Sequence, residues 1–198
     1  MRQKIYLDEN GITIKCTPNC IVGYKEIVNG IEYEVADREL VITRIRSFSD
    51  ASKLCVSLIT DMSYLFQYEP FFNDRIDNWD VSNVTNMKGM FYWTIFNQPI
   101  GNWDVSKVTN MEGMFYTSNF NKDICNWNVS KVKNMASMFC NSKFNKPIGN
   151  WDISGAETTE GMFAASKFNH PIVNWDFRNL KRKNFMFMDC KFKQELGF

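Results

Sequence analysis

The chain has 198 residues, of which 44% are hydrophobic and 15% aromatic, and its formal net charge is +1. This apolar content is sufficient for a packed core, so the composition argues against intrinsic disorder. The neutral balance gives no electrostatic reason to expect nucleic acid as a partner, and no apolar run is long enough for membrane insertion.

The N-terminal stretch MRQKIYLDENG carries acids early and has no apolar core of signal-peptide length. We therefore expect an intracellular or virion-associated protein rather than a classically secreted one. The six cysteines are too few for a dense disulfide scaffold. Cys16 and Cys20 lie close in sequence, so three states are open for them: free thiols, a disulfide, or a metal-bound pair. Because the single histidine, His170, is distant in sequence, no metal site is predicted.

Residues 1–46 are predicted to form a small antiparallel β module. Three segments alternate apolar and polar side chains, as half-buried strands do: Lys4–Leu7, Thr13–Cys16 and Ile31–Val35. Asn29-Gly30 is a strong signal for a hairpin turn. Asp37–Arg46 either continues this module as a strand or forms a short helix.

Residues 47–71 are predicted to contain a helix followed by a degenerate half-repeat that caps the units after it. The segment Ile59–Met62 imitates Val84–Met87, with one residue inserted relative to the later period. Terminal units of stacked arrays need atypical sequences because they have a neighbour on one side only. The basic run Lys181–Lys183 fits a polar cap at the other end, or it contacts an acidic partner.

A period of 24 residues dominates residues 72–198. Each unit has a tryptophan that follows an asparagine, and a Met-Phe pair follows at a constant distance. The tryptophans are Trp79, Trp103, Trp127, Trp151 and Trp175, and the first four Met-Phe pairs contribute Phe91, Phe115, Phe139 and Phe163. Periods of roughly 20 to 50 residues are typical of arrays whose units stack. We therefore predict a five-unit solenoid with a C-terminal cap, in which these residues form the core.

Within a unit, Trp-Asp-Val-Ser alternates as a short strand does, and Met-x-x-Met-Phe places its methionines on one face of a helical turn. Glycine at 89, 113 and 161 is expected to keep that helix short or to let another backbone approach. The predicted fold class is an α/β repeat solenoid, leucine-rich-repeat-like, with one short strand and one helical turn per coil behind the N-terminal β module.

The tryptophan column has two interpretations, a buried core or an exposed aromatic ladder. Each tryptophan lies two residues before another apolar residue, as Trp103 does before Val105, and this shared face favours the core. A buried indole N–H needs an acceptor, which we expect to be a carbonyl of the adjacent coil.

Two polar columns also repeat. The aspartate after each tryptophan is replaced by Asn128 in one unit, so this column is expected to supply a hydrogen-bond acceptor rather than a cation-binding charge. The column Asn86, Asn110 and Asn134 is interpreted as helix caps or as a ladder that satisfies the backbone.

The unit FNQPIGNWDVSKVTNMEGMF, residues 96–115, closely resembles the BspA-type surface-protein repeat, and the resemblance extends over residues 55–192. The stretch ITIKCTPNCIVGYKEIVNGIEYEVADREL resembles the leader module before such repeats. This family, labelled a domain of unknown function (DUF285), occurs in bacterial surface proteins, lipoproteins and large DNA viruses. The resemblance implies a leucine-rich-repeat-like fold, a role in adhesion or protein interaction, and no shared catalytic residues.

No enzymatic site is predicted, because the chain has one histidine and neither a glycine-rich phosphate loop nor a nucleophile elbow. We expect a non-enzymatic scaffold that binds a protein partner and needs no cofactor. The candidate binding residues are Tyr92, Trp93, Tyr116, Lys107 and Lys131. Two alternatives remain: a structural component of a larger assembly, such as a minor virion or surface-layer protein, and a carbohydrate-binding adhesin that uses the three aromatic residues.

Overall fold

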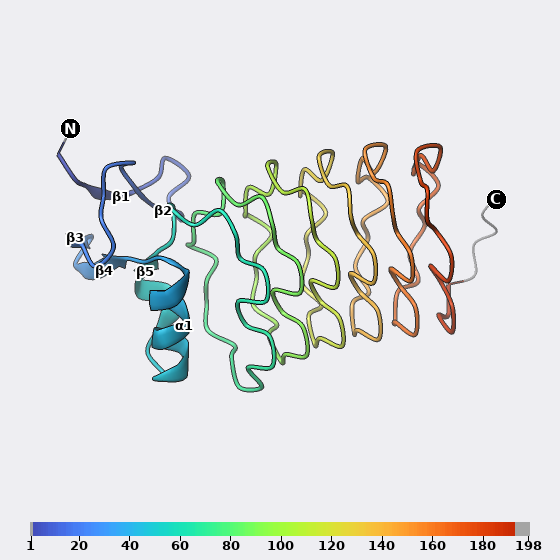
Figure 1. The fold of residues 1–198 in the computed structure, drawn as a ribbon, viewed down its shortest axis with the longest axis horizontal. Helices are drawn as coiled ribbons and strands as arrows, with labels where there is room; N and C mark the ends of the chain where they lie inside the picture. Colours follow the sequence, from blue (N-terminus) through green and yellow to red (C-terminus); the bar gives the residue numbers. More distant parts are fainter. Residues whose placement is uncertain (1, 193–198) are drawn as a thin grey trace.

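The computed structural model describes residues 2–192; Met1 and residues 193–198 lie outside the described part. Figure 1 shows short strands and one helix at the N-terminal end, followed by a row of similar coils that extends toward the C-terminus. The coils follow one another in chain order, and parallel bridges join each coil to the next. The fold is therefore a small mixed α/β structure with repeated units.

Five short strands lie at the N-terminal end. They are β1 (Ile5–Leu7), β2 (Ile14–Cys16), β3 (Lys25–Val28), β4 (Ile31–Val35) and β5 (Leu54–Cys55). β1 and β2 pair antiparallel in one sheet, whereas β3, β4 and β5 form a second sheet with an antiparallel and a parallel pair. The sheet that contains β4 and β5 brings distant segments of the chain together.

The predicted hairpin forms between β3 and β4. Asn29 and Gly30 have φ of 50° and 81°, and this pair of left-handed residues suits the twist of a tight hairpin. The β1–β2 hairpin contacts the repeats, because the Ile14 N–H donates to the Asn78 carbonyl at 2.8 Å. The N-terminal sheets are thus attached directly to the first full repeat.

One α-helix, α1 (Arg38–Arg46), packs its buried face against the main core. Asp37 caps the helix by accepting a hydrogen bond from the Leu40 N–H at 2.8 Å. The chain leaves the helix through Phe48, which has a left-handed φ of 54° and lies exposed. The sequence allowed either a strand or a short helix for Asp37–Arg46, and the structure shows the helix.

The helix predicted within residues 47–71 does not form. After α1, this segment contains a short 3₁₀ turn, η1 (Ala51–Lys53), and β5. Asp50 accepts hydrogen bonds from the N–H and the hydroxyl of Ser52, and Tyr64 has a left-handed φ of 56°. Both features oppose a continuous helix. The division of the chain after residues 46 and 71 stays a prediction.

The four-residue strand predicted in each repeat is absent from the described coils. Pairing between coils is limited to one bridge per coil, along the column Asp61, Asn86, Asn110, Asn134, Thr158 and Arg182. The strand fails because the chain turns directly after the tryptophan. The Asp104 carboxylate accepts from the Ser106 N–H at 3.0 Å, and the Val108 N–H bonds to the Val105 carbonyl at 2.9 Å. The aspartate column thus supplies acceptors, as predicted.

The helical turn predicted at Met-x-x-Met-Phe is replaced by successive tight turns. The Met114 N–H bonds within its coil to the Met111 carbonyl at 3.1 Å, whereas the next N–H, on Phe115, bonds to Met138 of the following coil at 2.9 Å. An α-helix would direct all of these groups along its own axis. Here alternate amides hold the coil closed and join it to its neighbour.

Left-handed residues cause this alternation. Two columns in the coils have φ between 50° and 60°. One contains Tyr64, Gly89, Gly113, Ser137, Gly161 and Phe185, and the other contains Tyr68, Trp93, Thr117, Asn141, Ala165 and Asp189. The glycines are therefore explained by positive φ rather than by a need to shorten a helix. The Asn110 side chain accepts from the Glu112 N–H at 3.0 Å, so the asparagine column satisfies the backbone without capping a helix.

The coils share one continuous apolar interior. All five periodic tryptophans are buried, at 5% exposure or less, together with the paired phenylalanines at positions 91, 115, 139 and 163. Rings stack between neighbouring coils, with 5.6 Å between the centroids of Phe115 and Phe139. The Trp127 indole N–H donates to the Ile100 carbonyl at 3.0 Å, and Trp103, Trp151 and Trp175 repeat this bond one coil apart. Each indole therefore joins its own coil to the preceding one.

Candidate functional site

Four exposed or half-buried aromatic residues gather on one edge of the first coils. This aromatic cluster consists of Tyr68, Tyr92, Trp93 and Tyr116. The Tyr68 and Trp93 side chains are 58% and 57% exposed. The Tyr68 ring meets Trp93 edge-on at 6.1 Å, and Tyr92 stacks on Tyr116 at 4.6 Å. The structure thus unites three of the predicted binding residues and adds Tyr68.

The backbone positions of Tyr68 and Trp93 are unfavourable for large side chains. Both residues lie in a left-handed column where later coils place Thr117, Asn141 and Ala165. A left-handed backbone costs roughly 1–2 kcal/mol for residues other than glycine and is unusual for bulky ones. Since these two rings are largely outside the core, burial recovers little of that cost. The left-handed φ recurs at this position in every described coil, so what distinguishes Tyr68 and Trp93 is the large exposed ring that each carries there.

The two stacked tyrosines form the more buried part of the aromatic cluster. Burial, followed by the neighbouring phenol of Tyr116, raises the pKa of Tyr92 above its ordinary value. The Tyr92 phenol therefore stays protonated at neutral pH and can donate a hydrogen bond. The stacked pair has parallel planes, 3° apart, so each ring covers one face of the other. The cluster offers ring edges, phenol groups and the free surface of Trp93.

A charged pair borders the aromatic cluster. The Lys88 ammonium lies 3.0 Å from the Glu112 carboxylate and 5.9 Å from the centre of the Tyr64 ring. Its hydrogen bond with Glu112 raises the pKa of Lys88. The Tyr64 ring packs over Gly89, where a Cβ atom would overlap it. These contacts make the surface beside the cluster charged but internally paired.

The structure places the other two predicted binding residues on a different edge. Lys107 and Lys131 are exposed and lie in the turn that follows the serine of each repeat. Lys107 donates a hydrogen bond to Asn83 Oδ1 of the preceding coil at 2.8 Å. A binding role for these two lysines would therefore require a surface separate from the aromatic cluster.

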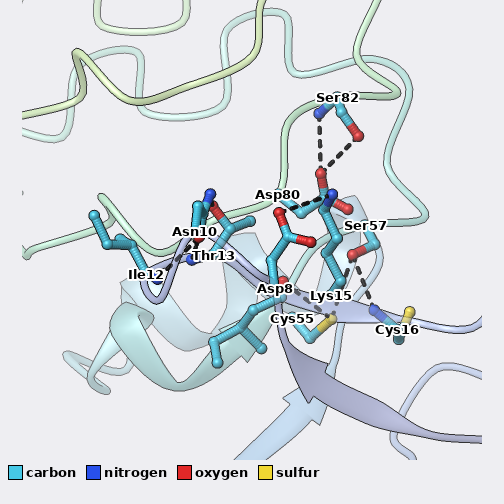
Figure 2. Close-up of polar contacts among 11 residues, drawn as sticks. Asp8, Asn10, Ile12, Thr13, Lys15, Cys16, Cys55, Ser57, Asp80 and Ser82 are labelled. Carbon is cyan, nitrogen blue, oxygen red and sulfur yellow. Dashed lines mark hydrogen bonds and ion pairs between the residues drawn. The ribbon is translucent and has the colours of Figure 1, made fainter.

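A polar pocket that the sequence did not predict lies where the β1–β2 hairpin meets the first repeats (Figure 2). Its volume is about 140 Å³, and Asp8, Lys15, Asp80 and Asp104 supply its charges. The signal was weak because Asp8 lies between the two predicted strand segments Lys4–Leu7 and Thr13–Cys16, far in sequence from the repeats. Only the packing of the hairpin against the repeat brings these residues together.

Three carboxylates face one ammonium group in this pocket, and only one of the carboxylates forms an ion pair within the described residues. Lys15 lies 3.1 Å from Asp8, and Asp80 accepts hydrogen bonds from the N–H and the hydroxyl of Ser82 at 3.2 and 2.7 Å. Burial lowers the pKa of Lys15, but the bond to Asp8 and the charge of Asp80 outweigh it, so the net pKa is raised. Lys15 is therefore a cation at neutral pH that pairs with Asp8 inside its own hairpin and is attracted by Asp80 of the first repeat, an arrangement that does not suit proton transfer.

The thiols close to this pocket are buried and free. Cys16 and Cys55 share the apolar cluster of the N-terminal sheets, and the Cys16 N–H donates to the Ser57 hydroxyl at 3.2 Å. Hydrogen bonding with Cys55, together with burial, raises the pKa of the Cys16 thiol. Cys20 is also free, and no set of three metal-binding side chains occurs within residues 2–192.

A family model described as "Mycoplasma protein of unknown function, DUF285" matches residues 39–143 and 96–197. The chain belongs to the DUF285 family. The two matched ranges overlap over residues 96–143. The family match confirms the resemblance to BspA-type repeats. No curated protein and no solved structure matches the chain. In the part of this DUF285 protein that the structure describes, no helix is long and apolar enough to span a membrane.

Proposed function

We propose that this DUF285 chain is a non-enzymatic scaffold for protein–protein interaction, built as a leucine-rich-repeat-like solenoid. The stack of rings, indoles and methionines supports a rigid frame, because each coil buries the same apolar positions. Surface positions differ from coil to coil, so specificity is expected there.

The exposed aromatic cluster is the observation that carries this proposal. Aromatic side chains supply much of the binding energy at protein interfaces, since they bury a large area with few rotatable bonds. Tyr68 and Trp93 keep their rings outside the core in a conformation that disfavours them. A partner that buries these rings would supply the stabilisation that the free protein lacks.

A quantitative pull-down from the native source tests the proposal. Three baits are compared: the native chain, Tyr68→Ala/Trp93→Ala, and a control, Lys107→Ala/Lys131→Ala. We expect the native bait and the control to recover one protein in a constant ratio to the bait. The aromatic variant should not recover this protein. Recovery of the same proteins by all three baits would remove the aromatic cluster as the interface.

Carbohydrate binding is a second candidate, because the Trp93 ring is largely exposed and sugars stack on flat aromatic faces. The stacking of Tyr92 on Tyr116 counts against it, since each ring already covers a face of the other. A glycan array separates the two functions. Binding to a sugar that depends on Trp93 would favour an adhesin, and an array without signals would leave the protein interface.

A further inference from the structure

The edge that carries the aromatic cluster continues across all later coils. A second column lies two residues after the Trp93 column, and all of its members are exposed except the half-buried Asn119: Ile95, Asn119, Lys143, Lys167 and Lys191. The Lys143 N–H donates to the Ser118 carbonyl at 3.1 Å, and the Lys167 N–H donates to Ser142 at 3.2 Å. Successive coils are therefore in direct contact along this edge, and its side chains form one row.

The second half of the row consists of lysines that form no ion pair within the described part of the chain. Lys143, Lys167 and Lys191, here called the lysine row, are exposed and have no ion pair or side-chain hydrogen bond within residues 2–192. Their coils are close, because the adjacent phenylalanine rings lie 6.3 and 6.1 Å apart. Like charges at such spacing repel one another.

Two other lysines of the coils form ion pairs with a neighbouring coil. Lys88 pairs with Glu112 at 3.0 Å, and Lys181 pairs with Glu157 at 2.7 Å. The lysine row differs from these two pairs because three successive coils carry, at the same position, a lysine without an ion pair to any described residue, and the net charge of +1 shows that it is not part of a generally basic protein. An unpaired row of this kind favours a ligand that supplies regularly spaced negative charge.

We propose that this edge, from Tyr68 to Lys191, binds an extended acidic segment of the protein partner. Its apolar residues lie against the aromatic cluster and Ile95, and its acidic side chains lie along the lysine row. The edge crosses five coil steps, on the order of 25 Å at strand-like spacing, which an extended segment of about eight residues spans. This inference rests on the proposed interaction function and specifies its partner.

The same edge is poorly suited to a single-stranded nucleic acid. Such ligands stack their bases on free aromatic faces within a long basic groove. Here Tyr92 and Tyr116 are stacked on each other at 4.6 Å, which leaves no space for a base between them. The lysine row also offers few phosphate contacts, whereas an extended peptide with several acidic side chains can reach successive lysines of the row.

A displayed library of random peptides, about twelve residues long, tests the inference on the full chain. We expect selected peptides to combine a hydrophobic half with an acidic half. By fluorescence anisotropy, Lys143→Glu/Lys167→Glu should weaken their binding at least ~10-fold at low salt, and the loss should shrink as salt is added. The control Lys107→Glu/Lys131→Glu carries the same change of charge on another edge and should bind normally.

Three results would overturn the inference. The first is a set of peptides without acidic enrichment, or no selected peptide at all. The second is equal binding to the native chain and Lys143→Glu/Lys167→Glu, with circular dichroism showing both folded. The third is displacement of the peptides by a single-stranded oligonucleotide at comparable concentration. If peptide binding depends on Tyr68 and Trp93 but is unchanged by substitutions in the lysine row, this inference is refuted, whereas the proposed function is still supported.

Discussion

Trp127 shows how a single residue joins two coils. Its ring is buried, and its indole N–H donates to the Ile100 carbonyl of the preceding coil at 3.0 Å. The sequence predicted both the burial and the hydrogen bond, because identical large residues at a fixed period indicate stacked units with a shared interior. The exposed Trp93 breaks the period, and that irregularity was the signal for a surface role.

Replacing Trp127 by phenylalanine is expected to destabilise the protein by about 2–3 kcal/mol, because it leaves a cavity and an unsatisfied buried carbonyl. Urea unfolding measures the change. Trp93→Phe is the matched control and should alter stability by less than ~0.5 kcal/mol, since its ring is largely exposed. Equal effects of the two substitutions would contradict the assigned burial.

The left-handed columns make a second prediction at single positions. Gly113→Ala should lose about 1 kcal/mol, because alanine resists positive φ while its Cβ would make only ordinary contacts. Ser137, in the same column with φ of 54°, should gain up to about 1 kcal/mol when replaced by glycine. Thermal or urea unfolding of both variants tests the pair. Stabilisation by Gly113→Ala would show that this column is not left-handed.

At the scale of elements, the sequence predicted the β3–β4 hairpin but assigned the wrong local structure to the repeat. The hairpin depends on two adjacent residues, Asn29 and Gly30, whose preference is strong and local. The Met-x-x-Met-Phe spacing fits a helix equally well, and the left-handed residues that exclude one include Ser137 and Thr117. Serine and threonine do not favour positive φ, and the glycines in the column of Ser137 were instead interpreted as shortening a helix or allowing close approach of another backbone.

The polar pocket was missed for a different reason. Asp8 and Asp80 are far apart in sequence, and only the docking of the β1–β2 hairpin brings them to the same pocket. The aromatic cluster was partly predicted, since Tyr92, Trp93 and Tyr116 recur at related positions of neighbouring coils. Tyr68 was not, because an inserted residue displaces the first coil from the regular period.

The ion pair of Lys15 with Asp8 predicts a pH-dependent contribution to stability. The folded-state pKa of Lys15 is raised, so the contribution is complete below its ordinary pKa of 10.5 and is lost as pH rises through the folded value. Lys15→Met should therefore lower the free energy of unfolding at pH 8 by less than ~1 kcal/mol, because the pair is partly exposed.

The gap between Lys15→Met and the native chain should narrow in urea titrations as the buffer is made strongly alkaline. Lys131→Met serves as a control, because it removes an exposed lysine away from this pocket. A constant gap at all pH values would mean that packing of the Lys15 side chain, rather than its charge, accounts for its contribution to stability.

At the scale of the whole molecule, stability is expected to vary along the stack. Central coils have a neighbour on both sides, and their phenylalanines are fully buried, whereas Phe187 of the last described coil is only partly buried. Units in a linear array are stabilised mainly by nearest neighbours. Amide hydrogen exchange should therefore be slowest around Phe115 and Phe139 and fastest around Phe185. Uniform protection along the coils would contradict a nearest-neighbour stack.

The central claim is that coils stack through a shared interior, with each periodic indole bonded to the coil before it. The exchange of the six indole N–H protons in D₂O, followed by ¹H–¹⁵N spectroscopy, tests this directly. Five signals, from Trp79, Trp103, Trp127, Trp151 and Trp175, should persist, while that of Trp93 should vanish at once. Loss of all six signals at the rate of Trp93 would contradict the account.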